Sequence, residues 1–316
     1  MTSGNIVAGI KAPYIENSIE AQIQMRAYVV KMFKPELVSA ETFDFDVYSN
    51  TFASYPHRVD DDVPPQYMSN FSQSGKVAWA HYTMFMSDSE KLRAKEANRW
   101  GKTMAEASKT QGIVENNHIL GALMTAAHAD NTVAASTPWV DGGEPDPAAK
   151  IEQELAQAIS LLQTNMDMDE QDDSMSKVHV FLPDDTRAPM KLQGMYDNIS
   201  ISLKKYFENS FEVQFHFSRD RTDSRAVTAY NLTAALGNDA LLFPEFAGSM
   251  DSVGRLHHFD PAEARARGVP YAEFKRIEMK GDSYMTRRAF VFTATQADST
   301  ATTNYNIGKI EDVRVT

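Results

Sequence analysis

Residues 61–95 read DDVPPQYMSNFSQSGKVAWAHYTMFMSDSEKLRAK, and this stretch places several local patterns one after another. Its first part is acidic and carries two adjacent prolines, which the interiors of helices and sheets tolerate poorly. Residues 75–85 then alternate in side-chain character in the way that is typical of a β-strand. SDSE at 87–90 matches a capping box, with Ser87 as the N-cap and Glu90 reaching back to it. The stretch therefore predicts a stiff loop, a strand and the start of a helix.

The helix that begins there is predicted to be very long. No proline occurs between Ser87 and about Ala127, and strong helix formers dominate this segment. A helix of about 40 residues spans about 60 Å, whereas the usual length is about 11 or 12 residues. Gly101, Gly112 and Gly121 each weaken it by up to about 1 kcal/mol, so the sequence allows a bend or an interruption. The heptad pattern is too irregular for a coiled coil, so we expect the helix to lie across another part of the protein.

Upstream of the quoted stretch, the sequence predicts an extended arm and another strand. Pro13 and Pro35 interrupt the arm, which leaves one helical piece around residues 19–32. TFDFDVYSNTF at 42–52 is rich in aromatic and β-branched residues and is predicted to be a strand. With the strand at 75–85 it predicts a long hairpin, whose polar, proline-bearing connection of about 25 residues is too long for an ordinary turn and indicates a function.

Downstream of the long helix, helices and strands follow one another without a regular repeat. Asp146 as N-cap and Pro147 at the first helical position predict a helix whose apolar stripe is Ile151, Leu155, Ile159 and Leu162. The other expected elements are a buried strand at 177–183, a helix at 188–205, a strand at 211–217, a helix at 224–236 that stops at Gly237, a strand at 240–244, a hairpin around 280–283 and a closing segment at 306–315. The predicted fold class is α+β.

Composition and charge narrow the function classes. The chain has 316 residues, a net charge of -12 and no cysteine, so disulfides, thiolate metal sites and cysteine nucleophiles are excluded. The net negative charge argues against a general nucleic-acid-binding surface, because affinity for phosphates comes mainly from Lys and Arg. The N-terminal segment lacks the pattern of a secretory signal, and no uncharged stretch reaches the roughly 20 residues of a membrane span. We expect an intracellular or particle-bound soluble protein.

The charges are unevenly placed along the chain. Residues 151–173 hold seven acids and no Lys or Arg, whereas residues 88–110 hold six bases against four acids. Each segment can be a solvated face, or the two can make electrostatic contact between copies of the chain.

The stretch HRVDDDVPPQY at 57–67 contains three consecutive aspartates, Asp60, Asp61 and Asp62. Consecutive residues in extended backbone point to opposite sides, so these carboxylates do not converge on an ion by themselves. A solvated acidic loop tip, a metal site and a salt-bridged contact with another chain all remain open for this segment.

Catalytic and ligand-binding motifs are absent from the sequence. No G-x-S-x-G, P-loop or G-x-G-x-x-G pattern occurs, and VDGGEPD has acids where a phosphate would bind. The eight histidines show no metal-ligand spacing, and the rings of HHFD at 257–260 are expected to point apart. We therefore predict no catalytic, cofactor-binding or metal residue and no cofactor, with a metal-dependent hydrolase using Asp60–Asp62 and a histidine as a remote alternative. The histidines are His57, His81, His118, His128, His179, His216, His257 and His258.

The order of the predicted elements, together with the stretch quoted at the start, resembles the major capsid protein of tailed viruses, bacteriophage or archaeal, with the HK97-like fold. In capsid proteins of this kind an acidic and proline-bearing segment, a returning strand and a long helix follow one another, and the resemblance covers residues 40–200. It implies an N-terminal arm (1–41), an extended β-hairpin called the E-loop (42–86), a peripheral domain with the spine helix (87–127) and the start of the axial domain (to 200), and the axial domain with returning peripheral strands (201–316).

The resemblance also implies a function. Such a protein self-assembles as hexamers and pentamers into an icosahedral shell, and encloses double-stranded DNA without sequence-specific binding. The implied partners are further copies of the chain, a scaffolding protein and a portal during assembly, and a cement protein, with no membrane. The implied location is the virion, and the host cytoplasm during assembly. An encapsulin-type protein nanocompartment is the alternative, because it uses the same fold to enclose a cargo enzyme.

The candidate contacts between subunits follow from the charges. A thin shell subunit cannot bury a long hairpin within itself, and two-stranded ribbons are marginally stable in water, so the hairpin needs neighbours. We expect the acidic loop to face the basic start of the long helix of a neighbouring copy. The candidate contact residues are Arg58, Asp60, Asp61, Asp62, Lys91, Arg93, Arg99 and Lys102.

Overall fold

The computed structural model describes most of the chain in two compact units. The described residues are 28–48, 70–89, 96–139, 147–165, 175–196, 199–218, 236–246, 250–277, 280–297 and 301–314. Unit 1 comprises residues 1–43, 74–119 and 255–293, and unit 2 comprises residues 44–73, 120–254 and 294–316. Each unit is therefore built from segments that lie far apart in the sequence.

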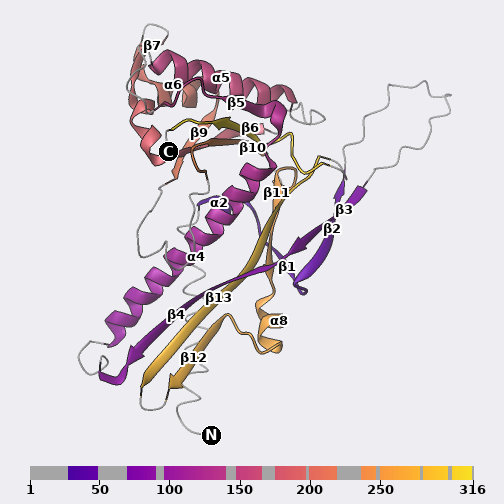
Figure 1. Ribbon diagram of the computed structural model, residues 1–316, viewed down its shortest axis with the longest axis vertical. Helices are drawn as coiled ribbons and strands as arrows, with labels where there is room; N and C mark the ends of the chain where they lie inside the picture. The colour runs from indigo at the N-terminus through magenta and orange to yellow at the C-terminus, as the bar shows by residue number, and fades with distance from the viewer. Residues whose placement is uncertain are drawn as a thin grey trace, which may run out of the picture. The chain divides into compact units, whose positions relative to one another are not determined.

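Unit 1 is built on a five-stranded sheet (Figure 1). Strands β1 (Glu36–Val38), β11 (Gly254–Phe259), β13 (Gly281–Ala294) and β12 (Ala272–Ile277) follow in this order, and β4 (Ala78–Ser87) also pairs with β13. β1 runs parallel to β11, whereas β12 and β4 run antiparallel to β13. The predicted hairpin around residues 280–283 is confirmed as the β12–β13 pair.

The partner of β4 differs from the one predicted. The strand at 75–85 was expected to return along residues 42–52, but β2 (Thr42–Tyr48) pairs with β3 (Asn70–Lys76), and β4 pairs with β13 instead. Residues 75–85 are not one strand, because β3 ends at Lys76 and β4 begins after the buried Val77, whose N–H donates to the Glu41 carbonyl. Alternation along a strand reports which residues share a face, not which strand lies beside it, so the prediction of the hairpin partner was wrong.

The long helix is confirmed as α4 (Glu96–Ala126), which has 31 residues and ends within one residue of the expected position. It continues without interruption through all three of its glycines, so the allowed break does not occur. α2 (Tyr28–Met32) forms the end of the helical piece expected at 19–32. Of the predicted capping box, the Ser87 hydroxyl lies 3.1 Å from the Ser89 hydroxyl, and Glu90 lies outside the described residues.

Unit 2 packs the helix α5 (Pro147–Asn165) on a second sheet. The strand order is β5, β14, β10, β6, β9, and the bounds are Thr132–Ala134, Gly308–Glu311, Ala240–Phe246, Met175–Pro183 and Val213–Ser218. The four residues of the predicted apolar stripe of α5 are at most 1% exposed and pack against apolar residues of this sheet, so the stripe is confirmed. α5 begins at Pro147 as predicted, while its expected N-cap, Asp146, lies outside the described residues.

The helix expected at 188–205 is wrong. Two 3₁₀ turns (Asp184–Arg187 and Pro189–Lys191) lead into the antiparallel pair β7 (Gln193–Tyr196) and β8 (Ile199–Ser202), and α6 (Leu203–Ser210) follows. The sequence ISIS at 199–202 has the period of two that a strand requires. The Ser202 hydroxyl then accepts a hydrogen bond from the Lys205 N–H, which starts the helix only there. Of the helix expected at 224–236, residues 224–235 lie outside the described residues, and Leu236 lies in a turn with Gly237, which has φ +56.

Candidate functional site

Most of the residues predicted to contact a neighbouring copy fall outside the part of the chain that the structure describes. These are Arg58, Asp60, Asp61, Asp62, Lys91 and Arg93. Arg99 and Lys102 lie within α4, where the backbone is described but their side chains are not. The proposed contact between an acidic loop and a basic helix therefore stays a prediction.

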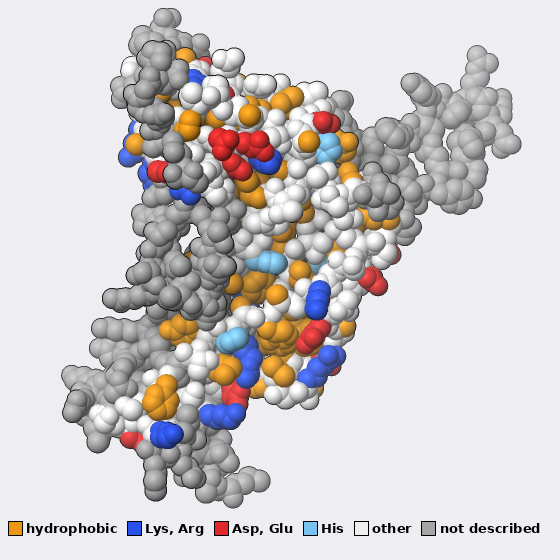
Figure 2. Space-filling view, viewed as in Figure 1, with side chains coloured by type: hydrophobic (Ala, Val, Ile, Leu, Met, Phe, Trp, Pro, Cys, Tyr) orange, Lys and Arg blue, Asp and Glu red, His pale blue; other side chains and the backbone are white. Residues whose placement is uncertain are grey.

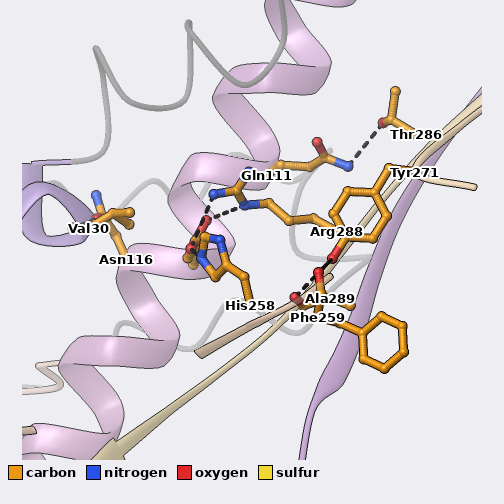
Figure 3. A network of polar contacts seen from close by, with 10 residues as sticks. Val30, Gln111, Asn116, His258, Phe259, Tyr271, Thr286, Arg288 and Ala289 are labelled. Atoms are coloured by element: carbon orange, nitrogen blue, oxygen red, sulfur yellow. Dashed lines mark hydrogen bonds and ion pairs between the residues drawn. The ribbon is translucent and has the colours of Figure 1, made fainter. Parts of the chain in front are cut away.

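Buried polar contacts fix α4 to the sheet of unit 1 (Figure 3). Glu115 of α4 is fully buried, and its two carboxylate oxygens accept hydrogen bonds from side chains of two different strands. Arg288 Nε of β13 lies 2.6 Å from Oε2, and His258 Nε2 of β11 lies 2.6 Å from Oε1. Burial alone raises the pKa of the Glu115 carboxyl, but His258 and Arg288 outweigh it and hold this pKa below its usual value. Glu115 is therefore buried as a paired carboxylate.

Two further contacts between α4 and β13 lie on either side of this ion pair. One helical turn earlier, Gln111 Nε2 donates to Thr286 Oγ1 at 3.0 Å, and one turn later the His118 ring meets Phe290 edge-on at a centroid distance of 5.5 Å. Residues 111, 115 and 118 share one side of a helix, and residues 286, 288 and 290 share one face of a strand. Three successive helical turns are thus matched to three successive residues on one face of β13.

The opposite face of the same sheet carries a small apolar core. Ala289 and Val291 of β13 are buried there with Phe259 and Tyr271. The Tyr271 hydroxyl donates to the Phe259 carbonyl at 2.6 Å and lies 3.3 Å from the Ala289 carbonyl, as Figure 3 shows. One face of β13 therefore carries a buried ion pair beside the buried Phe290 and Phe292, whereas the other face carries apolar packing alone among these residues.

The start of the β2–β3 pair is fitted closely into unit 1. A Cβ atom added at Gly75 would lie 2.6 Å from Cζ of Phe43, so only glycine leaves room for this ring. The Phe43 ring also lies against His257, at a centroid distance of 4.5 Å. Phe43 of β2 and Gly75 of β3 are thus fixed within unit 1.

The adjacent histidines 257 and 258 have different partners, which confirms the expectation that their rings point apart. His257 Nε2 lies 3.2 Å from a carboxylate oxygen of Glu36 on β1, whereas His258 contacts Glu115 on α4. Within the described ranges, no group of three or more His, Asp or Glu side chains is placed to hold a metal ion. Among the described helices, none is long and apolar enough to cross a membrane.

Acidic and basic side chains lie next to one another on the face of the molecule shown in Figure 2. The ion pairs of the described residues agree with this picture, and an exposed pair such as Arg267 with Glu263 contributes only about 0 to 1 kcal/mol. The described part of this face thus offers mixed charge rather than a field of one sign. Examples are Arg267 with Glu263 at 2.8 Å, Arg287 with Glu273 at 2.7 Å and Lys309 with Glu311 at 2.6 Å.

The Glu115 network was not predicted from the sequence. His258 and Arg288 lie 143 and 173 residues from Glu115, and no local pattern connects positions so far apart. The one signal in the sequence that could indicate a buried acid was the position of Glu115 on the side of the long helix that faces the sheet. Such a buried acid requires partners, but the sequence does not say which ones.

The fold is shared with solved shell structures, although a scan against protein-family models and a search of curated proteins found no match. The chain of a virus-like particle from Pyrococcus furiosus is 8% identical, with 95% of this chain and 99% of that chain covered and a TM-score of 0.53. The mature capsid of bacteriophage PhiM1 gives 10% identity, 89% and 84% coverage and a TM-score of 0.54. The capsid of Myoviridae phage XM1 gives 12% identity, 90% and 91% coverage and a TM-score of 0.51.

At identities this low, the likeness concerns the fold. The chain has the mixed α and β fold of viral and virus-like shell proteins. More particularly, phage capsids are prominent among the structures that share it, so the resemblance inferred from residues 40–200 is confirmed at the level of the fold.

Proposed function

We propose that this chain is a major capsid protein of a tailed virus, which self-assembles as hexamers and pentamers into an icosahedral shell around double-stranded DNA. The observation that carries the proposal is the likeness of about nine-tenths of the chain to the phage capsids of PhiM1 and XM1. The net charge of -12 supports it, because a container for DNA must not adhere tightly to a packed polyanion. The proposed role is structural rather than enzymatic.

The assignment of the HK97-like parts belongs to the same proposal. We assign β2, β3 and the segment between them to the E-loop, and α4 to the spine helix. Support comes from the separate two-stranded β2–β3 sheet, since a ribbon of two strands needs further packing to be stable in water. The length of α4 and its fixation through Glu115 fit a helix that keeps one shape in every subunit.

The two units support the predicted domains in outline. In unit 1, the strands β11, β12 and β13 return from the last quarter of the chain to the sheet that contains β4, which fits a peripheral domain with returning strands. Unit 2, with α5 and the sheet from β5 to β9, fits the axial domain. A scaffolding protein, a portal and a cement protein are the further partners of the proposal. The virion, and the host cytoplasm during assembly, are its locations.

An encapsulin-type compartment is the second candidate. The likeness to the virus-like particle from Pyrococcus furiosus, which covers 99% of that chain, shows that the fold is not confined to phage capsids. We favour the virus shell, because phages recur among the similar structures.

Electron microscopy of the full chain tests the proposal. The chain is expressed alone and together with the proteins encoded next to it, and the particles are imaged in negative stain. We expect hollow icosahedral particles in at least one of the two preparations, with neighbouring portal and terminase genes for a virus shell and a neighbouring cargo gene for a compartment. Unassembled or amorphous protein in both preparations contradicts a shell function.

A further inference from the structure

Three titratable side chains form a continuous line across one face of the unit 2 sheet. His179 of β6 lies between His216 of β9 and Glu245 of β10, and these strands are direct neighbours. His179 Nδ1 is 2.9 Å from His216 Nε2, and His179 Nε2 is 3.0 Å from Glu245 Oε2. We refer to Glu245, His179 and His216 as the histidine chain.

The histidine chain lies on the face of the sheet opposite to α5. Val178, Val180 and Leu182 of β6 are buried in the core that contains α5, and side chains alternate along a strand, so His179 and Phe181 point to the other face. There the Phe181 ring stacks on His216 at a centroid distance of 4.6 Å. The imidazoles are therefore held among aromatic rings, and His179 itself is 1% exposed.

The hydrogen bonds of the histidine chain fix where its protons lie. A carboxylate oxygen only accepts, so His179 donates from Nε2 to Glu245. The Nδ1 atom of a neutral His179 then carries a lone pair, and His216 donates to it from Nε2. One proton occupies each of the two contacts in this neutral state.

Acid changes this arrangement in two steps. A first added proton leaves the bond between the rings intact, because one ring still offers a lone pair to the other. A second added proton places an N–H on both facing nitrogens, and two donors cannot share a hydrogen bond. Two positive rings 2.9 Å apart also repel each other, so the contact between β6 and β9 side chains is lost.

The surroundings oppose the uptake of protons by both rings. Burial lowers the pKa of His179 and outweighs the opposing effect of Glu245, while Lys177 lowers it further. Burial also lowers the pKa of His216, to about 3, with further contributions from His179, Lys204 and Lys177. Among the described charged groups, Glu245 of β10 favours the protonated rings, and Lys177 of β6 and Lys204 of α6 oppose them.

We propose that the histidine chain is an acid-sensitive switch, which joins the side chains of β6 and β9 while its rings are neutral and separates them, opening the edge of the unit 2 sheet at β9, when both rings are protonated. The opening is local, because β5 and β14 at the other edge of the sheet carry none of these three groups. The inference concerns the chain itself and holds whether or not the protein forms a shell.

Hydrogen exchange of the full chain measures the opening directly. Peptides that cover β9 and β14 are compared at pH 7.5 and pH 5, after correction for the intrinsic pH dependence of amide exchange. We expect corrected exchange in β9 to rise by more than about 30-fold, and by up to about 1000-fold, at pH 5, because two histidines with an ordinary pKa of about 6.5 in the open state each take up a proton there. An equal rise in β14, or no rise in β9, overturns the proposal.

A matched pair of variants locates the effect in the rings. His216→Gln keeps an N–H donor for His179 but does not titrate, so the acid-induced rise in β9 is expected to fall below about a third of the wild-type rise. His81→Gln, at an exposed position of β4 in unit 1, is expected to leave the rise unchanged. A rise in His216→Gln as large as in the wild type contradicts the proposal. If that variant does not fold, the comparison of β9 with β14 in the wild type decides.

Discussion

The helices α4 and α5 are held to their sheets in two different ways. α5 uses a stripe of four apolar residues, each at most 1% exposed. The inward side of α4 in unit 1 instead presents Gln111, Glu115 and His118 to one face of β13. Both kinds of contact are sensitive to change, because apolar cores are close-packed and because removal of one partner of a buried ion pair leaves an uncompensated charge. Each helix also buries a residue of the other kind, Ile119 on α4 and Glu154 on α5. The difference therefore lies in the partners of the two carboxylates, since Glu115 meets the cation of Arg288, whereas Glu154 accepts from the neutral Trp139 Nε1 at 2.6 Å.

Breaking the ion pair of α4 gives the largest expected effect. Glu115→Gln leaves the guanidinium of Arg288, which is 4% exposed, without its charge partner, and we expect a loss of about 3–5 kcal/mol in the free energy of unfolding. Urea denaturation of the full chain measures this loss. Glu311→Gln, which removes an exposed partner of Lys309, is the matched control and is expected to cost at most about 1 kcal/mol. Equal effects of the two substitutions contradict the large contribution of the buried ion pair that fixes α4.

Truncating the stripe of α5 is expected to cost about 2–5 kcal/mol. Leu155→Ala removes a fully buried side chain and leaves a cavity in the core of unit 2. The exposed Gln157→Ala on the same helix serves as the control, with an expected change within about 0.5 kcal/mol. We expect Leu155→Met, which conserves volume, to keep most of the stability that Leu155→Ala loses. No neutral substitution can do the same at Glu115, because its charge is what its partners need. A loss below about 1 kcal/mol in Leu155→Ala is incompatible with the stripe as the main support of α5.

Acid is expected to weaken the polar contacts of the protein but not its apolar ones. Burial holds the pKa values of His118, His179 and His216 below their ordinary value. A group with a depressed pKa in the folded state stabilises the protein above the pKa of the unfolded state, about 6.5, and this contribution is lost as the pH falls. The lowered pKa of Glu115 acts in the same direction below about pH 4.5. Urea titrations at pH 7.5 and pH 5 should show a smaller free energy of unfolding at pH 5, and a protein that is more stable at pH 5 contradicts this expectation.

Substitutions of two glycines by alanine distinguish the effect of close packing from the effect of helix propensity. Gly75→Ala brings a methyl group against the Phe43 ring, and we expect a loss of about 1–3 kcal/mol. Gly121→Ala in α4 meets no atom within 4 Å and should stabilise the protein by about 0.5–1 kcal/mol. Thermal unfolding of both variants provides the check. Opposite signs are expected. A Gly75→Ala variant that is as stable as the wild type or more stable refutes the close approach of Phe43 to Gly75, and a destabilised Gly121→Ala variant refutes the expected gain in helix propensity.

The smallest effect is expected from the acidic loop. Replacing Asp60, Asp61 and Asp62 by Asn should weaken assembly by about 0–1 kcal/mol for each exposed ion pair, and less at high salt because of screening. Light scattering at low and high ionic strength follows assembly in the wild type and the triple variant. This prediction rests on the proposed function. Identical assembly at every ionic strength refutes the contact role of the loop without affecting the predictions for the helices.

The sequence predicts those features of the fold that depend on residues close together in the chain, and fails for those that depend on residues far apart. α5 and its stripe were predicted because an apolar period of 3.6 residues is a local signal. The partner of β4 was wrong, because β13 lies about 200 residues downstream and alternation does not identify it. The helix expected at 188–205 was wrong because its helix-forming residues outweighed the period-two signal of ISIS in the prediction.

The candidate site shows the same limit. The rings of HHFD were correctly expected to part, since adjacent residues in a strand point to opposite faces. The convergence of Glu115, His258 and Arg288 depends on three elements meeting in space, which no spacing in the sequence reports. The acidic loop and the basic residues from Lys91 to Lys102 remain predictions, because their side chains are not among those described.

The long sequence separation within the Glu115 network has a consequence for synthesis on the ribosome. α4 is complete by residue 126, but the partners of its buried carboxylate are made 143 and 173 residues after Glu115 itself. Until then, docking α4 against a partial sheet would bury an unpaired charge, which is strongly unfavourable. We therefore expect α4 to dock on its sheet only after β13 has emerged from the ribosome.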